Sequence, residues 1–225
     1  MKFTSFLCLY LIFTFIIVPI FARPFGRVPL RTTNNLRPAT IWTVILNRNY
    51  VKPELLNAAY KVSNEIANKY PGTVLNYLDA SFPFINKYPL FPHLSHNDGK
   101  KLDLSFCYNA TKTGQSTNVV PSPIGYGISE EPLPNETNTA LNCGNKGYWQ
   151  YSMLNHIIPQ SNKASFTFNE SKTKELVLLW ANQDGIGKIF IEPHLVARLH
   201  LSHPKIRFHG CHAVRHDDHL HVQLK

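Results

Sequence analysis

The chain has 225 residues, 44% of them hydrophobic and 16% charged, and a formal net charge of +9. This composition excludes a disordered or fibrous protein, and the length suits one domain with a sizeable hydrophobic core. The positive charge favours polyanionic partners by long-range attraction, but it does not choose between nucleic acid, an anionic membrane and a cell-wall polymer.

An apolar run from Phe3 to Ala22 stands apart from the rest of the chain. It suits a signal peptide with a cleavage point at Ala22, and it is just long enough to cross a bilayer as an anchor. Residues 1–22 are therefore predicted to be a signal peptide or a membrane anchor, and the remainder is expected to be exported. Several arginines follow the run, beginning at Arg23, and by the positive-inside tendency they disagree with export of an anchored chain.

The next segment, residues 23–40, is rich in Arg, Pro and Asn and is predicted to be a linker. Residues 52–70 are predicted to form a helix, because Pro53 suits a first-turn position and Pro71-Gly72 closes the segment. The apolar residues of this helix recur at helical spacing and predict one face that packs on a core: Leu55, Ala59, Val62, Ile66 and Tyr70.

Residues 109–147 are dominated by Asn, Thr, Pro, Ser and Gly, and they predict a long loop insert that is either a functional rim or disordered. The other predicted elements are strands at 73–77, 102–107, 188–192, 205–209 and 219–224, and helices at 171–181 and 193–201. Strands and helices are mixed without regular βαβ alternation. They predict an α+β domain over residues 41–225, with a small, mainly antiparallel sheet and flanking helices.

Three cysteines lie in the body of the chain, and they allow one disulfide with one thiol left over. Cys107 shares the strand parity of Asp103 and could face a site on that side of the sheet. A structural disulfide from Cys107 to Cys143 or Cys211 is the expected use of this cysteine.

Histidines cluster near the end of the chain, most densely in His216-Asp217-Asp218-His219-Leu220-His221-Val222. On a strand, residues two apart point the same way, so His219 and His221 are predicted to project together from one sheet face. Both can bind one metal, or one can bind it while the other works beside it. A His-x-His pair is more often plain polar surface, and a histidine-rich tail can also bind metal without catalysis.

Further ligands are available in His96-Asn97-Asp98-Gly99-Lys100-Lys101-Leu102-Asp103. Leu102 and Leu104 alternate with Asp103, so the carboxylate is expected on the face opposite the core. If this strand neighbours the last one, His96, Asp103 and His221 converge. Two imidazoles and a carboxylate with one open position make a catalytic zinc site, and zinc lowers the pKa of bound water to about 7. His216 and His219 then lie nearby for proton transfer and charge stabilisation.

Other residues are expected to have ordinary structural or surface roles. Three histidines are expected to be supporting or surface groups: His93, His209 and His212. The aromatic residues past the insert could line a sugar- or peptide-binding cleft, although core packing is the default for such side chains: Tyr148, Trp149 and Tyr151. Glu130-Glu131 is predicted to be a solvated turn in the insert.

Two motifs together resemble a known family. Ser95-His96-x-x-Gly99-x-x-x-Asp103-Leu104 and the segment from His216 to Val222 are similar to the two signatures of the penicillin-insensitive murein endopeptidases. That family belongs to the superfamily of lysostaphin-like enzymes, D-alanyl-D-alanine metallopeptidases and hedgehog domains. The similarity covers roughly residues 85–110 and 170–225, including Lys188-Ile189-Phe190-Ile191-Glu192-Pro193.

The resemblance implies a hedgehog-like fold, with Zn²⁺ held by His96, Asp103 and His221 and with catalysis assigned to His219 and His216. It implies hydrolysis of amide bonds in peptidoglycan peptide cross-links, in the periplasm or cell envelope, with peptidoglycan peptides and not nucleic acid as partners. The chain departs from the family at Gln223, at residues 211–215 and in the 109–147 insert, which bears on the substrate bond more than on the metal site. A D,D- or L,D-carboxypeptidase of the same superfamily and a non-catalytic metal-binding domain are the alternatives.

Overall fold

The computed structural model describes residues 2–91 and 94–225. Most of its strand pairs are antiparallel, and helices and strands are mixed along the chain. The predicted mixture of helices with mainly antiparallel sheets is therefore confirmed. The strands are β1 (Val28–Pro29), β2 (Leu36–Pro38), β3 (Tyr50–Val51), β4 (Leu75–Tyr77), β5 (Lys101–Ser105), β6 (Tyr108–Ala110), β7 (Ser116–Thr117), β8 (Phe166–Phe168), β9 (Ile186–Phe190), β10 (Ile206–Arg207) and β11 (His219–Leu224).

The α-helices are α1 (Lys2–Ile12), α2 (Val18–Ala22), α3 (Ile41–Ile45), α4 (Pro53–Lys69), α5 (Thr139–Asn145), α6 (Met153–Ile157), α7 (Glu170–Ala181) and α8 (Pro193–Arg198). A π-helical turn at Phe13–Ile17 joins α1 to α2, and short 3₁₀ turns lie at Arg23–Phe25, Trp149–Ser152 and Lys163–Ser165. Each helix and strand predicted beyond residue 52 is present, with ends shifted by a few residues.

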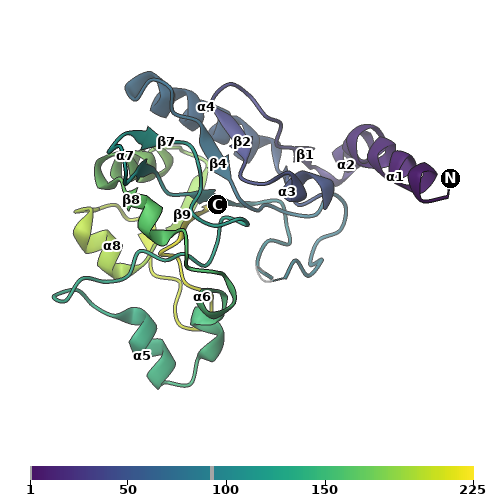
Figure 1. Ribbon diagram of the computed structural model, residues 1–225. Helices are drawn as coiled ribbons and strands as arrows, with labels where there is room; N and C mark the ends of the chain where they lie inside the picture. Colours follow the sequence, from purple (N-terminus) through teal and green to yellow (C-terminus); the bar gives the residue numbers. More distant parts are fainter. Residues whose placement is uncertain (1, 92–93) are drawn as a thin grey trace.

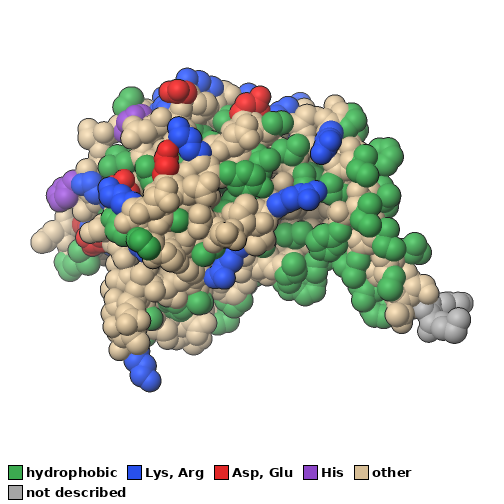
Figure 2. All heavy atoms as spheres, turned by 90° about the horizontal axis from the view of Figure 1, so that it is seen from above, with side chains coloured by type: hydrophobic (Ala, Val, Ile, Leu, Met, Phe, Trp, Pro, Cys, Tyr) green, Lys and Arg blue, Asp and Glu red, His purple; other side chains and the backbone are tan. Residues whose placement is uncertain are grey.

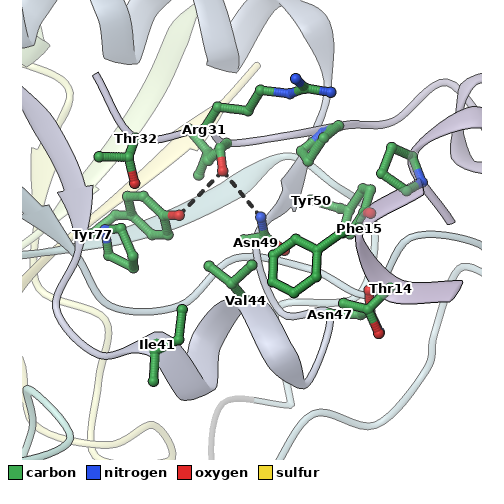
Figure 3. Close-up of a pocket in the computed structure, with 14 residues that line it drawn as sticks. Thr14, Phe15, Arg31, Thr32, Ile41, Val44, Asn47, Asn49, Tyr50 and Tyr77 are labelled. Atoms are coloured by element: carbon green, nitrogen blue, oxygen red, sulfur yellow. Dashed lines mark hydrogen bonds between the residues drawn. The ribbon is translucent and has the colours of Figure 1, made fainter. Parts of the chain in front are cut away.

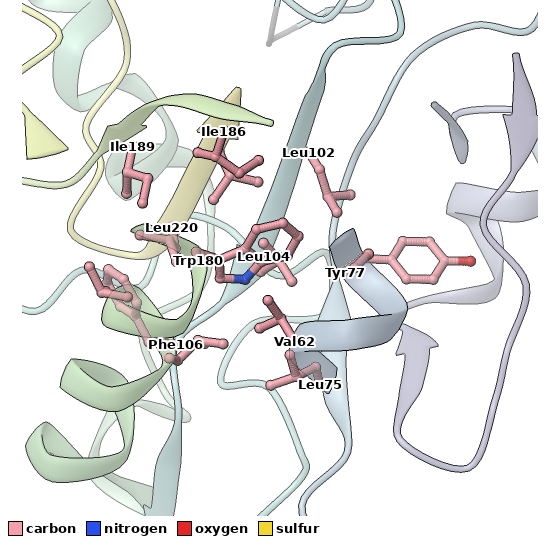
Figure 4. Packing of buried hydrophobic residues seen from close by; sticks show 14 of the residues in the cluster. Val62, Leu75, Tyr77, Leu102, Leu104, Phe106, Trp180, Ile186, Ile189 and Leu220 are labelled. Carbon is pink, nitrogen blue, oxygen red and sulfur yellow. The ribbon is translucent and has the colours of Figure 1, made fainter. Parts of the chain in front are cut away.

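The main sheet has six strands in the order β10-β9-β11-β5-β4-β2. The last strand in sequence, β11, lies in the middle, antiparallel to both β5 and β9. Helices α4 and α7 contact one another and cover one face of this sheet (Figure 1). Figure 4 shows the core between these helices and the sheet, where Leu104, Leu220 and Trp180 meet. The predicted apolar face of α4 is confirmed, because four of its residues at helical spacing are fully buried: Leu55, Ala59, Val62 and Ile66.

Residues 23–40, predicted as a linker, are part of the domain. Leu36 pairs with Leu75 in the parallel β2–β4 ladder and is fully buried. Arg27 is also buried, and its guanidinium donates hydrogen bonds to the carbonyl of Phe82 and to Asn86 Oδ1. The linker prediction was wrong because an arginine satisfied by distant carbonyls looks, by composition alone, like a solvated one.

The insert at residues 109–147 is mostly irregular but is packed on the domain. It contains β7 and α5, and β6 begins one residue before it. Tyr126 and Ile128, near its middle, are buried. The middle of the insert lies over the face of the sheet opposite α4 and α7, where Tyr126 contacts Asp103, whereas β7 contacts α7 through Ser116 and Lys172.

One helix of the described chain, Phe3–Phe25, is long and apolar enough to cross a membrane. A signal sequence has the same character, so either leader prediction is compatible with it. In Figure 1 this helix projects from the end of the domain that carries β1 and α3.

Candidate metal centre

The pairing of β5 with β11 positions the candidate ligands. Asp103 lies directly opposite His221 in this antiparallel ladder. The intervening Leu102, Leu104, Leu220 and Val222 point into the core, so Asp103 and His221 lie together on the other face. The predicted neighbourhood of the two strands is confirmed.

Three nitrogen and oxygen donors converge on this face. His96 Nε2 lies 3.2 Å from Asp103 Oδ2 and 3.3 Å from His221 Nδ1, and His221 Nδ1 lies 2.8 Å from Asp103 Oδ1. All three residues are buried, and their ligand atoms lie within 4.8 Å of one another. Ligand atoms around a tetrahedral zinc ion are roughly 3.3 Å apart, so the spacing fits a metal ion.

A backbone contact fixes the tautomer of His96. Its Nδ1 lies 3.0 Å from the carbonyl oxygen of Ala80, which can only accept a hydrogen bond. Nδ1 therefore carries the proton, and Nε2 can offer a lone pair toward the other two residues. The chemistry of this donor set fits a divalent cation held between the two imidazoles and the carboxylate.

The charges at the site are strongly coupled. Burial raises the pKa of Asp103, but the nearby His96, His219 and His221 outweigh burial and hold it well below its usual value. Burial lowers the pKa of His221 to about 4, against the attraction of Asp103. Burial lowers the pKa of His96, but Asp103, Asp79 and the hydrogen bond to the Ala80 carbonyl together outweigh burial and raise this pKa. A bound cation would disfavour the protonated forms of His96 and His221, because like charges repel.

His219 and His216 stand beside the three donors. His219 Nε2 is 3.7 Å from Asp103 Oδ2, and its Nδ1 is hydrogen-bonded to Asp218. Burial opposes protonation of His219, but Asp103 and Asp218 together raise its pKa to about 8. The His216 ring is 4.9 Å from that of His219 and 5.6 Å from that of His221. Burial, with its histidine neighbours, holds the pKa of His216 well below its usual value.

The insert also contributes to this centre, although its sequence did not predict this. Tyr126 donates a hydrogen bond of 2.8 Å to Asp103 Oδ2, and the Gly127 N–H donates one of 2.6 Å to Asp218 Oδ2. Gly125 has a φ of +85°, and a Cβ there would lie 2.3 Å from Leu78, so the turn that delivers Tyr126 requires glycine. The available signal was an aromatic residue between two glycines in an otherwise polar loop.

A cleft of about 320 Å³ opens beside the centre. His216 and His221 line it, and Trp149, which also lines it, is 73% exposed. The cleft interpretation of Trp149 is therefore favoured, whereas Tyr151 is buried and donates to Glu192 Oε1 at 2.5 Å. His209 and His212 also line the cleft, outside the three-donor group, and His93 lies outside the described residues.

The disulfide differs from the predicted one. Cys143 of α5 is bonded to Cys211, and both predicted pairings of Cys107 are wrong. β5 ends at Ser105, so strand parity does not reach Cys107, whose side chain lies in the core. Burial raises the pKa of the Cys107 thiol to about 12, which makes it a poor metal ligand.

Glu130 and Glu131 do not lie in a turn, and only Glu131 is exposed as predicted, 2.9 Å from Arg215. Glu130 is half-buried, and burial raises the pKa of its carboxyl group to about 7. Its carbonyl oxygen lies 2.7 Å from His194 Nε2. This contact with α8 is long-range, so the local sequence does not indicate it.

The structure brings all five predicted site residues to one place: His96, Asp103, His216, His219 and His221. Such a group can bind a divalent metal, polarise a carbonyl and exchange protons at the edge of an open cleft. Comparison with known proteins finds no protein-family model and no curated protein that matches this chain.

Proposed function

We propose that this protein is a zinc-dependent hydrolase that cleaves amide bonds in the peptide cross-links of peptidoglycan, in the manner of a murein endopeptidase. The observation that carries the proposal is the convergence of His96, Asp103 and His221 beside a cleft. The resemblance of the two motifs to the murein endopeptidase signatures supplies the substrate class and the hedgehog-like fold.

The roles proposed for the side chains follow from their positions. When bound, Zn²⁺ supplies Lewis acidity that polarises a substrate carbonyl and activates water. His216 lines the cleft, where it can meet a substrate, and His219 lies 3.7 Å from Asp103 and against the ring of Tyr126 from the insert. Two imidazoles so placed can take a proton from the nucleophile and pass it to the leaving amine.

The cleft lining favours endopeptidase action over carboxypeptidase action. A carboxypeptidase holds the free carboxylate of its substrate, a task suited to Arg or Lys. Among the described residues that line the cleft, none is Lys or Arg. The lining is instead largely apolar and aromatic, including Phe91, Leu94 and Met153.

The proposed location is the periplasm or cell envelope. The apolar Phe3–Phe25 helix suits export or anchoring. The net charge of +9 suits attraction to an anionic cell-wall polymer, and no nucleic-acid partner is proposed.

The test is product analysis after incubation of the zinc-loaded protein with purified peptidoglycan. Cleaved cross-links are expected, equally from peptides with free and with amidated carboxyl termini. A preference for free termini would favour the carboxypeptidase alternative. Zinc bound in a 1:1 ratio without any hydrolysis would favour a non-catalytic metal-binding domain, and full zinc content in the His96→Ala, Asp103→Ala and His221→Ala proteins would overturn the site itself.

A further inference from the structure

One face of the Phe3–Phe25 helix packs against the globular domain. Its residues recur at four-residue intervals: Tyr10, Thr14, Val18 and Ala22. The Tyr10 hydroxyl donates a hydrogen bond of 2.7 Å to the carbonyl of Ile45 in α3. Thr14, Val18 and Ala22 are 3%, 2% and 0% exposed. The helix is therefore docked along its side and is not attached only by its end.

This docking limits how the helix can meet a membrane. From Tyr10 to Ala22 the helix rises roughly 18 Å, and only the residues before Tyr10, roughly 10 Å of helix, extend clear of the domain. The hydrocarbon core of a bilayer is about 30 Å thick. With the domain in water, the helix in this position cannot span it.

The outer face of the helix and the neighbouring α3 form a continuous apolar surface. On the side of the helix away from the pocket described below, the exposed large side chains include Phe3, Phe6, Leu9, Ile12, Ile16 and Ile20. In α3, Thr43 points inward and donates to the carbonyl of Leu78 at 2.8 Å, which leaves Ile41 56% and Trp42 60% exposed. Leu46, one turn after Trp42, is 52% exposed. Figure 2 shows hydrophobic side chains gathered over this arm of the molecule.

The helix also covers apolar side chains of the domain. A pocket of about 270 Å³ lies between them, lined by Thr14 and Phe15 of the helix and by Val44 and Tyr77 of the domain (Figure 3). Tyr50, which packs with Val18 and Ala22, is 1% exposed. Cleavage after Ala22 would uncover this apolar lining to water, which costs free energy in proportion to its area.

We propose that the helix is retained and lies in the plane of one membrane leaflet, where it and α3 together dock the domain on anionic lipid. An exposed apolar face on a helix, with an aromatic side chain at its border, is the pattern of interfacial anchors. The exposed Arg23 and Arg31 lie at the base of the helix, and the net charge is +9, both of which attract acidic headgroups. This inference does not depend on the metal centre.

The first experiment adds the full chain to preformed vesicles of phosphatidylcholine and phosphatidylglycerol (3:1) that contain a bromine-labelled acyl chain. Bromine quenching of Trp42 fluorescence is expected in the wild type and in Trp149→Phe, and it should be lost in Trp42→Phe. The double variant Ile41→Ser/Leu46→Ser should bind at least about tenfold more weakly. Ile157→Ser, which removes an exposed apolar side chain from α6, should bind like the wild type.

The second experiment uses Cys8, which is exposed, whereas Cys107 is buried and the other two cysteines are joined in the disulfide. A nitrobenzoxadiazole label on Cys8 should be bleached by dithionite added outside the vesicles, because the in-plane helix stays in the outer leaflet. Protection of the label from dithionite would show that the helix spans the bilayer. Unquenched Trp42 fluorescence would show that the protein does not bind the vesicles in the proposed way. The intact mass of protein purified from the cells that express it would also overturn the proposal if it corresponds to a chain that begins at Arg23.

Discussion

Tyr126→Phe isolates the contribution of the insert to the metal centre. The substitution removes one hydroxyl, which donates a 2.8 Å hydrogen bond to Asp103 Oδ2. Burial raises the pKa of Tyr126 well above its usual value, so this hydroxyl remains a donor at any working pH. A hydrogen bond to a charged group contributes roughly 1.5–3 kcal/mol, and loss of a group that orients a metal ligand typically lowers affinity roughly 10- to 100-fold.

The assay is a zinc competition titration against a chromophoric chelator, with thermal unfolding measured in parallel. Tyr77→Phe is the matched control, because it removes a buried hydroxyl that donates to the carbonyl of Leu30 at 3.1 Å, away from the centre. It should lower stability without changing zinc affinity. Zinc affinity of Tyr126→Phe within twofold of the wild type would refute the reasoning that the insert orients Asp103.

Three further predictions concern turnover, stability and pH. His216→Ala and His219→Ala should keep zinc and the fold yet lose roughly 10²- to 10⁴-fold in turnover; loss of zinc from His219→Ala would make His219 a ligand, and wild-type rates in both would end the catalytic interpretation. Replacing Cys143 and Cys211 by Ser opens a cross-link of 68 residues and should lower the free energy of unfolding by about 4 kcal/mol in denaturant titrations, with an unchanged midpoint as the contrary result. The carboxyl of Glu130 titrates at about 7 in the folded protein against 4.5 ordinarily, so its ionisation destabilises the fold as pH rises between these values. Glu130→Gln should therefore match the wild type at pH 4 and gain about 2 kcal/mol by pH 8, whereas a gain that does not vary with pH would contradict this.

The alternation of apolar and polar residues along single strands predicted which side chains lie on each face of the sheet. The alternation of Leu102 and Leu104 with Asp103 placed the carboxylate opposite the core, and the same period placed His219 and His221. Both patterns have a period of two because both strands have one face in the core. The prediction of convergence then needed only the assumption that the two strands are neighbours.

Contacts between distant segments were not predictable in this way. The hydrogen bond from Tyr126 to Asp103 depends on how an irregular loop folds over the sheet, and no periodicity encodes that path. The disulfide partner of Cys143 is set by the approach of α5 to the segment before β11, and cysteine spacing alone leaves three pairings open. The sequence alone does not predict the burial of Arg27, because its acceptors, among them the carbonyl of Phe82, are far away in sequence.

The central position of β11 also determines when the site can exist. β5 and β9 precede it in the chain, and neither is paired with the other without it. During synthesis, a nascent chain therefore exposes two unpaired strand edges and carries His96 and Asp103 without their third partner until β11 emerges. Assembly of the metal centre and closure of the sheet are then one late, long-range folding event, which is slow relative to local helix formation. A chain truncated before His219 should have neither an intact sheet nor a metal centre.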